Sequence, residues 1–490
     1  MKLLRTLGVT VTILTLLGIS SAQSWTLLAN PSPGPVGPVL QLRDGRILAH
    51  EDQGGDAGQW WILTPDIHGS YVNGTWSNGG HMQSGYAPFF FGSQVLLDGK
   101  HIAVEGGEYN NGTPVWTTLG SYGTLSGSTI SWTANAPPSG WGTIGDAQSI
   151  VLPNKTYMQA NCCTPQAALF NGPNSWTPTG NVKAIRNDES GWTSLTNDKI
   201  LAVDVQINNN CGGSLRSSEY YDQTSGTWSC GPQTTVQLWQ QADQELGTAV
   251  MMYNNKVIQF GGNVVATNVL DVAANVWANG PTPPNQLDQA DGPSALEPNG
   301  KVLAMLSPGL FQGGCQFLEY DPTSNTLATT VNSAQCPSDS SFVGHLMILP
   351  TGQIMSTDFN NAIYVYNPAS GVVSGVAPTA ILSTTKFLAG STNNVVSGTQ
   401  LNGLSGNNAY GDDYQAETDF PLVRLTNQAT GNVYWALTHD DSSHSIKPGT
   451  FSTTKFDIPP TVPAGTYNFN VITNGIPSNT ISIIIGGSHS

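Results

Sequence analysis

One pattern of apolar and polar positions recurs seven times along the chain. An apolar strand leads into a polar tight turn and then into a second apolar strand. The turns include Asp98-Gly99 and Asn299-Gly300, residue pairs that tolerate positive φ and therefore favour hairpins. The copies begin roughly 44 to 56 residues apart, and they span 39–49, 94–104, 149–159, 193–203, 249–259, 294–305 and 346–356. A period of about 45–50 residues is typical of four-stranded propeller blades, so we predict seven blades.

A tryptophan marks the end of most of these units. After the hairpin come a strand, a turn and then Trp76, Trp132, Trp176, Trp228 or Trp277. Units six and seven keep the turn but carry Leu327 and Val372 instead. We interpret these side chains as packing between neighbouring blades. The segment 25–28 precedes the first hairpin, and we expect it to supply the outer strand of the last blade and so close the ring.

The period stops after Pro378. Alternating strands follow at 422–425, 433–437, 451–458 and 467–472, which is typical of an immunoglobulin-like sandwich. We therefore predict an all-β chain: a seven-bladed β-propeller at 23–378 followed by an immunoglobulin-like β-sandwich at 379–490.

Composition supports this fold class. Only 10% of the 490 residues are charged, too few for solvent-exposed amphipathic helices, whereas 55 Gly and 31 Pro provide many turns. The formal net charge of −16 argues against nucleic acid and anionic membrane surfaces as partners.

The N-terminus predicts export. Lys2 and Arg5 precede the apolar run 7–19, and small residues follow at 20–22. This is the pattern of a secretory signal peptide, residues 1–22. The run is too short for a membrane span, and no other stretch of the sequence is apolar enough for one. We therefore expect a secreted, extracellular protein. We also expect it to be a monomer.

Six cysteines in an exported chain predict disulfides. Cys211 and Cys230 bracket one strand-turn-strand unit, and Cys315 and Cys336 bracket another, so we predict these two pairs. Cys162 and Cys163 are adjacent. They can form a vicinal disulfide or remain thiols, and an oxidising compartment favours the disulfide.

The repeat and the C-terminal strands resemble the kelch-type propeller of the galactose oxidase and glyoxal oxidase superfamily, with its immunoglobulin-like (E-set) domain. The match is best at 243–263, which ends in the kelch pair Gly261-Gly262, and in the sandwich at 434–439, 463–467 and 474–477. The resemblance covers about residues 25 to 487.

Those oxidases hold one copper ion with two Tyr and two His, and one Tyr is crosslinked to a Cys. The resemblance places Leu246 at the crosslinking Cys, Asp291 at the crosslinked Tyr and Phe342-Val343 near the Tyr-His pair, with His345 close by. The His of the sandwich alone has a counterpart, His439. We therefore do not expect copper-radical chemistry, because the phenolates that bind Cu(II) are missing.

In this fold the family's functional residues lie just before the innermost strand of each blade. Here those positions are acidic, and three tryptophans accompany them. The acids are Asp146, Asp188, Glu189, Asp243, Glu245, Asp288, Asp291 and Asp339, and the tryptophans are Trp141, Trp192 and Trp239. Glu105 and Glu108, which follow a second strand, are weaker candidates for the channel lining.

Aromatic faces stack on sugar rings, and carboxylates accept hydrogen bonds from hydroxyls or act as general acid and base. We therefore predict a cleft for a neutral extracellular glycan. The residues that would be catalytic are Asp188, Glu189, Asp243 and Glu245, and those that would bind substrate are Trp141, Asp146, Trp192, Trp239, Asp291 and Asp339.

Alternatives remain open. The acids could cap turns or bind a stabilising Ca²⁺, and otherwise no cofactor is expected. The protein is either a carbohydrate-binding protein or a carbohydrate-active hydrolase or lyase, and a galactose-oxidase-like copper oxidase is the least favoured alternative. If Trp192 and Trp239 line the cleft, alanine at either should weaken glycan binding and leave the thermal midpoint nearly unchanged.

Overall fold

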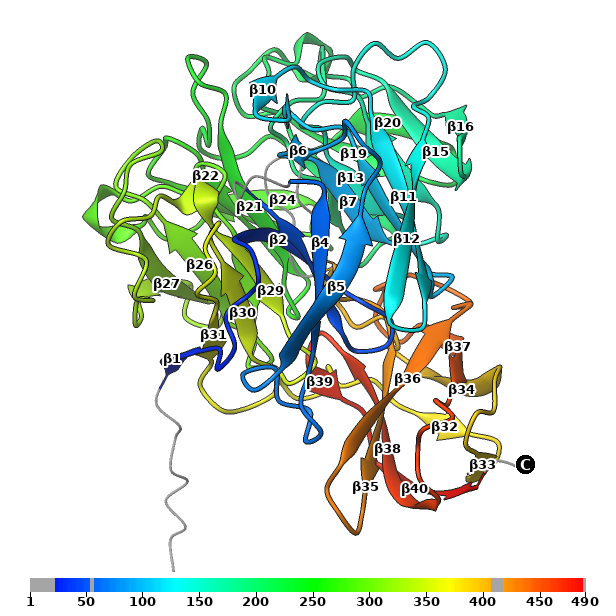
Figure 1. Ribbon diagram of the computed structural model, residues 1–490. Coiled ribbons are helices and arrows are strands. Elements are labelled where there is room, and N and C mark those ends of the chain that lie inside the picture. Colours follow the sequence, from blue (N-terminus) through cyan, green and yellow to red (C-terminus); the bar gives the residue numbers. More distant parts are fainter. Residues whose placement is uncertain (1–22, 53–56, 407–416, 488–490) are drawn as a thin grey trace, which may run out of the picture.

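The computed structural model describes residues 23–52, 57–406 and 417–487; the predicted signal peptide lies outside them. The described residues form seven four-stranded antiparallel sheets arranged in a ring, and a C-terminal β domain packs beneath it (Figure 1). This confirms the predicted fold class.

Each blade begins at the channel with its innermost strand and ends at the outside. Blade 1 contains β2 (Val36–Gln41), β3 (Ile47–Glu51), β4 (Gln59–Thr64) and β5 (Thr75–His81); blade 2 contains β7 (Gly92–Val95), β8 (His101–Glu105), β11 (Gly120–Ser126) and β12 (Thr129–Asn135); blade 3 contains β13 (Ser149–Val151), β14 (Tyr157–Ala160), β15 (Ala167–Gly172) and β16 (Ser175–Pro178). Blade 4 contains β17 (Thr193–Ser194), β18 (Lys199–Val203), β19 (Ser218–Asp222) and β20 (Thr227–Cys230); blade 5 contains β21 (Leu246–Met251), β22 (Lys256–Gly261), β23 (Thr267–Asp271) and β24 (Val276–Asn279). Blade 6 contains β25 (Ser294–Leu296), β26 (Val302–Leu306), β27 (Gln316–Asp321) and β28 (Thr326–Thr329); blade 7 contains β29 (His345–Ile348), β30 (Ile354–Thr357), β31 (Tyr364–Asn367) and β1 (Ser24–Leu27).

Short elements join these strands. Blade 2 carries a small extra sheet of β6 (Pro88–Phe89), β9 (Tyr109–Asn110) and β10 (Thr113–Pro114). The 3₁₀ helices are η1 (Asn209–Cys211), η2 (Pro284–Gln286) and η3 (Ser341–Val343).

The N-terminal strand closes the ring, as predicted. Strand β1 pairs antiparallel with β31, with Trp25 opposite Tyr366. The outermost position of blade 7 is therefore filled from the N-terminus, and Val372 lies outside any strand. Trp25 packs against Phe317 of blade 6 and donates its indole N–H to Val331 O at 2.8 Å. Blade 7 thus has a tryptophan in its outer strand after all.

The other outer tryptophans show why the repeat needs them. Trp132 Nε1 donates to Gly79 O of blade 1 at 3.1 Å, and Trp176 Nε1 donates to Ala136 O at 2.8 Å. Trp132 also stacks on Trp60 of blade 1 with ring centroids 5.4 Å apart. These residues therefore join neighbouring blades.

The C-terminal domain is one curled sheet. Its strand order is β32-β34-β37-β36-β35-β38-β40-β33, with β39 beside β38. The first half of β36 pairs with β35 and its end pairs with β37. This strand therefore connects the two halves of the curled sheet. The strands are β32 (Ile381–Leu382), β33 (Lys386–Leu388), β34 (Asn394–Thr399), β35 (Leu422–Asn427), β36 (Val433–His439), β37 (Phe451–Asp457), β38 (Gly465–Thr473), β39 (Ile476–Pro477) and β40 (Ile481–Gly486).

A buried ion pair joins this domain to the propeller. Arg43, in the turn between β2 and β3, contacts Asp441 Oδ1 through Nη2 at 2.6 Å, and both side chains are almost fully buried. An apolar cluster that includes Leu97, Val151 and Phe420 lies in the same interface.

All three cysteine pairs are disulfides: Cys211–Cys230, Cys315–Cys336 and the vicinal pair Cys162–Cys163. The two long-range pairings are as predicted. In the described part of the chain, no helix is long and apolar enough to cross a bilayer.

We expect Asp441→Asn to lower the free energy of unfolding by about 3–5 kcal/mol, because it leaves the buried Arg43 guanidinium without its counter-charge. Urea unfolding checks this. Asp440→Asn is the matched control, since that side chain is 51% exposed; equal stability of the two variants would show that the ion pair contributes nothing.

Candidate acidic site at the propeller mouth

The innermost strands bring the predicted acidic positions to one opening. Innermost strands contact one another around the ring, for example β2 with β29 and β21 with β25. The segments that precede these strands therefore surround the same end of the channel. We call this end the mouth.

Three carboxylates from three blades meet there. Glu189 precedes β17, Glu245 directly precedes β21, and Asp291 precedes β25. One carboxylate oxygen from each lies within 4.8 Å of the others, and all three side chains are half-buried. We call this group the carboxylate triad, and all of its members are predicted site residues.

Burial and mutual repulsion change the protonation of the triad. Burial, together with the charges of Asp243, Asp188 and Glu108, raises the pKa of Glu245 to about 7, although a hydrogen bond with Asp291 counteracts part of the rise. Burial, followed by the charge of Glu245, also raises the pKa of Asp291 well above its usual range. The triad therefore retains at least one proton near neutral pH.

The backbone at the triad adopts a conformation that costs free energy. Glu189, Gln244 and Asp291 have φ values of 51°, 65° and 47°. A residue with a side chain loses about 1–2 kcal/mol in the left-handed region. Such conformations concentrate at functional sites, where the surrounding structure enforces them.

Turn capping explains only some of the acids. Asp288 accepts hydrogen bonds from the backbone N–H groups of Asn263 and Ala290, both at 3.2 Å. Glu245 and Asp291, in contrast, hydrogen-bond to each other through their side chains, which the proton retained by the triad makes possible.

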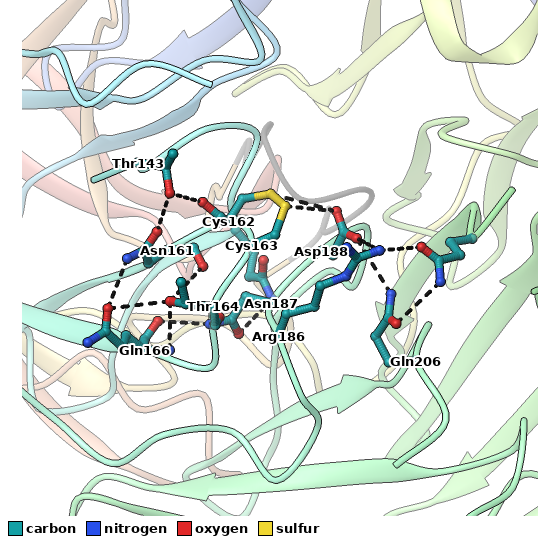
Figure 2. The surroundings of a disulfide bond; sticks show 12 residues. Thr143, Asn161, Cys162, Cys163, Thr164, Gln166, Arg186, Asn187, Asp188 and Gln206 are labelled. Atoms are coloured by element: carbon teal, nitrogen blue, oxygen red, sulfur yellow. Dashed lines mark hydrogen bonds and ion pairs between the residues drawn. A yellow bond between two sulfur atoms is a disulfide. The ribbon is translucent and has the colours of Figure 1, made fainter. Parts of the chain in front are cut away.

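A second group of residues borders the triad. Asp188 Oδ2 contacts Arg186 Nη2 at 2.6 Å, and its Oδ1 lies 3.7 Å from each sulfur of the Cys162–Cys163 disulfide (Figure 2). Asp146 is buried next to the same disulfide. Burial raises the pKa of Asp188, and Arg186 counteracts part of that rise.

Two further predicted acids have partners of their own. Asp243 accepts a hydrogen bond from Asn263 Nδ2. Asp339 forms a carboxyl pair with Asp358, which directly follows β30. Burial, together with Asp339, raises the pKa of Asp358 to about 7. The sequence repeat could not indicate Asp358, because it follows a second strand instead of preceding a first.

The expectation that Trp192 and Trp239 stack on a ligand is wrong. Their exposed fractions are 0% and 1%. Trp192 lies in the core between blades 3 and 4, with its ring centroid 5.5 Å from that of Trp228, and Trp239 packs with Leu246 between blades 4 and 5. Both therefore support the blades. Trp141 is half-buried in the loop before β13.

Two residues of the mouth stand apart from the main prediction. Glu108 was a weaker candidate; burial, and then the charge of Asp188, raise its pKa. Trp116 was not predicted. Its side chain is 48% exposed and lies beside Gly145, at the start of the blade 3 mouth segment. The sequence feature that could have identified Trp116 is its position outside the strand–turn–Trp pattern of the blade-packing tryptophans.

The residues at the copper-ligand positions do not fit a tyrosine-ligated copper. Leu246 is 1% exposed within an apolar core, and Asp291 belongs to the carboxylate triad. His439 packs against Gly99, in the turn after the innermost strand of blade 2. That turn is at the opposite end of the blade from the mouth, so His439 does not face the triad.

Comparison with known proteins supports the fold alone. No protein-family model matches the chain, and no curated protein matches it. A fungal alcohol oxidase of the AA5 family, solved in complex with copper, has a TM-score of 0.54 at 14% identity and covers 95% of this chain and 100% of its own. The predicted resemblance to this oxidase architecture is therefore confirmed as a likeness of fold.

Two lyase structures are also similar. A streptogramin B lyase has a TM-score of 0.47 at 11% identity, covering 72% of this chain and 99% of its own. An inactive virginiamycin B lyase from Staphylococcus aureus, solved with quinupristin, has a TM-score of 0.48 at 9% identity, covering 71% and 99%.

We expect Trp192→Ala to lower the free energy of unfolding by about 3–5 kcal/mol, the usual cost of truncating a buried tryptophan. Trp228→Ala, in the same core, should cost a similar amount. Trp141→Ala is the control and should change stability by less than about 1 kcal/mol. If the Trp192 variant were as stable as the control, the structural role of Trp192 would be contradicted, and a role in ligand binding would again have to be tested.

We also expect Glu245→Gln to stabilise the protein more at pH 8 than at pH 5. The raised pKa means that the folded state holds the Glu245 proton more tightly than the unfolded state. The charge therefore destabilises the fold increasingly as pH rises from the ordinary carboxyl range to about 7. Glutamine removes this penalty.

Thermal midpoints measured from pH 5 to pH 8 with a chelator present check this expectation. Asp440→Asn is the control, since a hydrogen bond from Lys455 lowers the pKa of Asp440 and its contribution to stability changes only below the ordinary carboxyl range. The difference between this variant and wild type should therefore stay constant from pH 5 to pH 8. A difference between Glu245→Gln and wild type that does not change with pH would contradict the burial of this charge.

Proposed function

We propose that this protein is exported and binds a neutral glycan at the propeller mouth. The convergence of Glu189, Glu245 and Asp291 from three blades is the observation that favours this function. Carboxyl oxygens accept hydrogen bonds from sugar hydroxyls, and three such groups meet at this one opening.

The charge of the molecule narrows the ligand class. The formal net charge is −16, and Arg186 at the mouth is already paired with Asp188. An anionic ligand would be repelled by the acids around it. A ligand rich in uncharged hydroxyls meets no such repulsion.

The N-terminal sequence pattern and the three disulfides support an extracellular location. Extracellular glycans are then accessible to the mouth. The fold by itself does not select this function, because propellers host many unrelated activities.

The protonation of the triad favours a second candidate function, cleavage of the glycan. A pKa of about 7 lets the Glu245 carboxyl donate a proton to a leaving oxygen at neutral pH. A neighbouring carboxyl, that of Glu189 or Asp243, would then serve as base or nucleophile. Most glycosidases use a pair of carboxyl groups, one as general acid and the other as base or nucleophile.

We expect Asp291→Asn to weaken glycan binding by roughly 10-fold or more, because the variant replaces one carboxyl oxygen of the triad, a hydrogen-bond acceptor, with an amide nitrogen that can only donate. A glycan array followed by calorimetry on the hits measures this. Asp440→Asn, a surface change in the C-terminal domain, should bind as wild type does. Unchanged affinity of the Asp291 variant would remove the triad from the binding site.

If the hits are also cleaved, Glu245→Gln should lower kcat by roughly 100-fold while retaining glycan affinity. The wild-type kcat should fall as pH rises through about 7, because Glu245 then loses the proton it donates. Product analysis of the array hits decides between the two functions. Binding without product at any pH from 5 to 8 selects the binding protein.

A further inference from the structure

Four chain segments lie side by side across blades 2, 3 and 4 at the mouth. Thr117 O accepts hydrogen bonds from the N–H groups of Ile144 and Gly145, both at 3.1 Å. Ile144 O in turn accepts from Cys162 N at 2.9 Å, and Cys162 forms a parallel bridge to Asn187. A continuous layer therefore runs from Trp116 to Asp188.

The blade 2 end of this layer is apolar. Trp116 is 48% exposed, and its backbone has a φ of 38°. Gly145 separates it from the vicinal disulfide: a Cβ at Gly145 would lie 3.4 Å from the Trp116 side chain and 3.0 Å from Cys162 Cβ. Cys163 is partly exposed and Cys162 is buried, so Cys163 presents the disulfide at the surface. We call Trp116 and the Cys162–Cys163 disulfide the platform.

Core packing does not account for this arrangement. A half-exposed tryptophan leaves much of its apolar surface in water, and the left-handed backbone adds a cost that a side chain other than glycine must bear. The hydrogen bonds of Thr117 and Cys162 hold the neighbouring backbone in place. The fold thus maintains an exposed aromatic residue at a defined point of the mouth.

The other end of the layer is charged. Asp188 Oδ1 lies 3.7 Å from both sulfurs of the disulfide, and Arg186 is bonded to the other oxygen (Figure 2). Glu189, the next residue, belongs to the carboxylate triad. The apolar platform and the acids are therefore adjacent along one line.

We propose that the platform is a binding subsite for one neutral hexopyranose unit. The C–H face of the ring would lie on the Trp116 indole and the disulfide, and hydroxyls at the ring edge would donate to Asp188 and Glu189. This inference rests on the proposed glycan-binding function and assigns to it the apolar contact that Trp192 and Trp239, being buried, do not supply.

This subsite predicts a preference among sugars. The platform needs a ring face free of charged substituents, and the acids disfavour carboxylated sugars. Neutral glucan, galactan or mannan oligosaccharides satisfy both conditions. Oligogalacturonates have the same ring size but carry a carboxylate on each unit. They are therefore the matched negative control and should bind more weakly than the neutral probes.

The test titrates the full-length mature protein with neutral hexose tetrasaccharides and with tetragalacturonate by calorimetry. Trp116→Ala should weaken binding of the neutral probes by roughly 5- to 100-fold, the range for loss of an aromatic anchor. Trp116→Phe should restore part of the affinity. Val115→Ala, at a neighbouring residue that is 54% exposed, should bind as wild type does.

Two further measurements address the contact itself. The neutral probe should change the tryptophan fluorescence of wild type, and most of that change should be absent in Trp116→Phe. The double variant Cys162→Ser, Cys163→Ser should also bind more weakly. If that variant unfolds, the Trp116 series, which leaves the disulfide intact, decides the outcome.

The outcomes separate the two proposals. Normal affinity of Trp116→Ala, together with lost affinity of Asp291→Asn, overturns the platform and leaves glycan binding standing. Failure of every neutral probe to bind wild type overturns both. Tighter binding of tetragalacturonate than of the neutral probes overturns the assigned ligand class.

Discussion

The pairing of β1 with β31 is the constraint on which the rest of the structure depends. A ring of sheets without this pair would end in an exposed edge at blade 7, and such edges invite association with other chains. Trp25 adds contacts to blade 6 at the same place, through Phe317 and Val331. The closed ring then holds the innermost strands together, and with them the loops of the mouth.

The mouth concentrates charge at a cost in stability. Burial raises the pKa values of Glu245 and Asp291, which means that ionising either carboxyl destabilises the folded protein. Proteins tolerate such arrangements where a site must bind or react. The interface with the C-terminal domain shows the opposite solution, because Arg43 there lies within 2.6 Å of Asp441 and neutralises it.

The likeness to an AA5 alcohol oxidase concerns the architecture. At the positions where the resemblance places the crosslinked Cys and Tyr, this chain has the buried Leu246 and the triad acid Asp291. The same propeller architecture therefore occurs in an oxidase solved with copper and in this chain, which has a carboxylate triad at its mouth. This is the expected behaviour of a fold whose function lies in its loops.

The sequence alone determined the blade number, the ring closure and the two long-range disulfides, because each depends on a local pattern repeated at a regular spacing. It also placed the acids at one end of the propeller, since each precedes an innermost strand. Only the tertiary structure decided which acids meet: Glu189, Glu245 and Asp291 converge, whereas Asp288 caps a turn and Asp339 pairs with Asp358. In the structure, Trp192 and Trp239 lie in the core, whereas Trp116, which the sequence pattern did not indicate, lies at the surface. The physical reason is that side-chain direction at a loop end depends on packing between blades, and a one-residue shift there turns a ligand contact into a core contact.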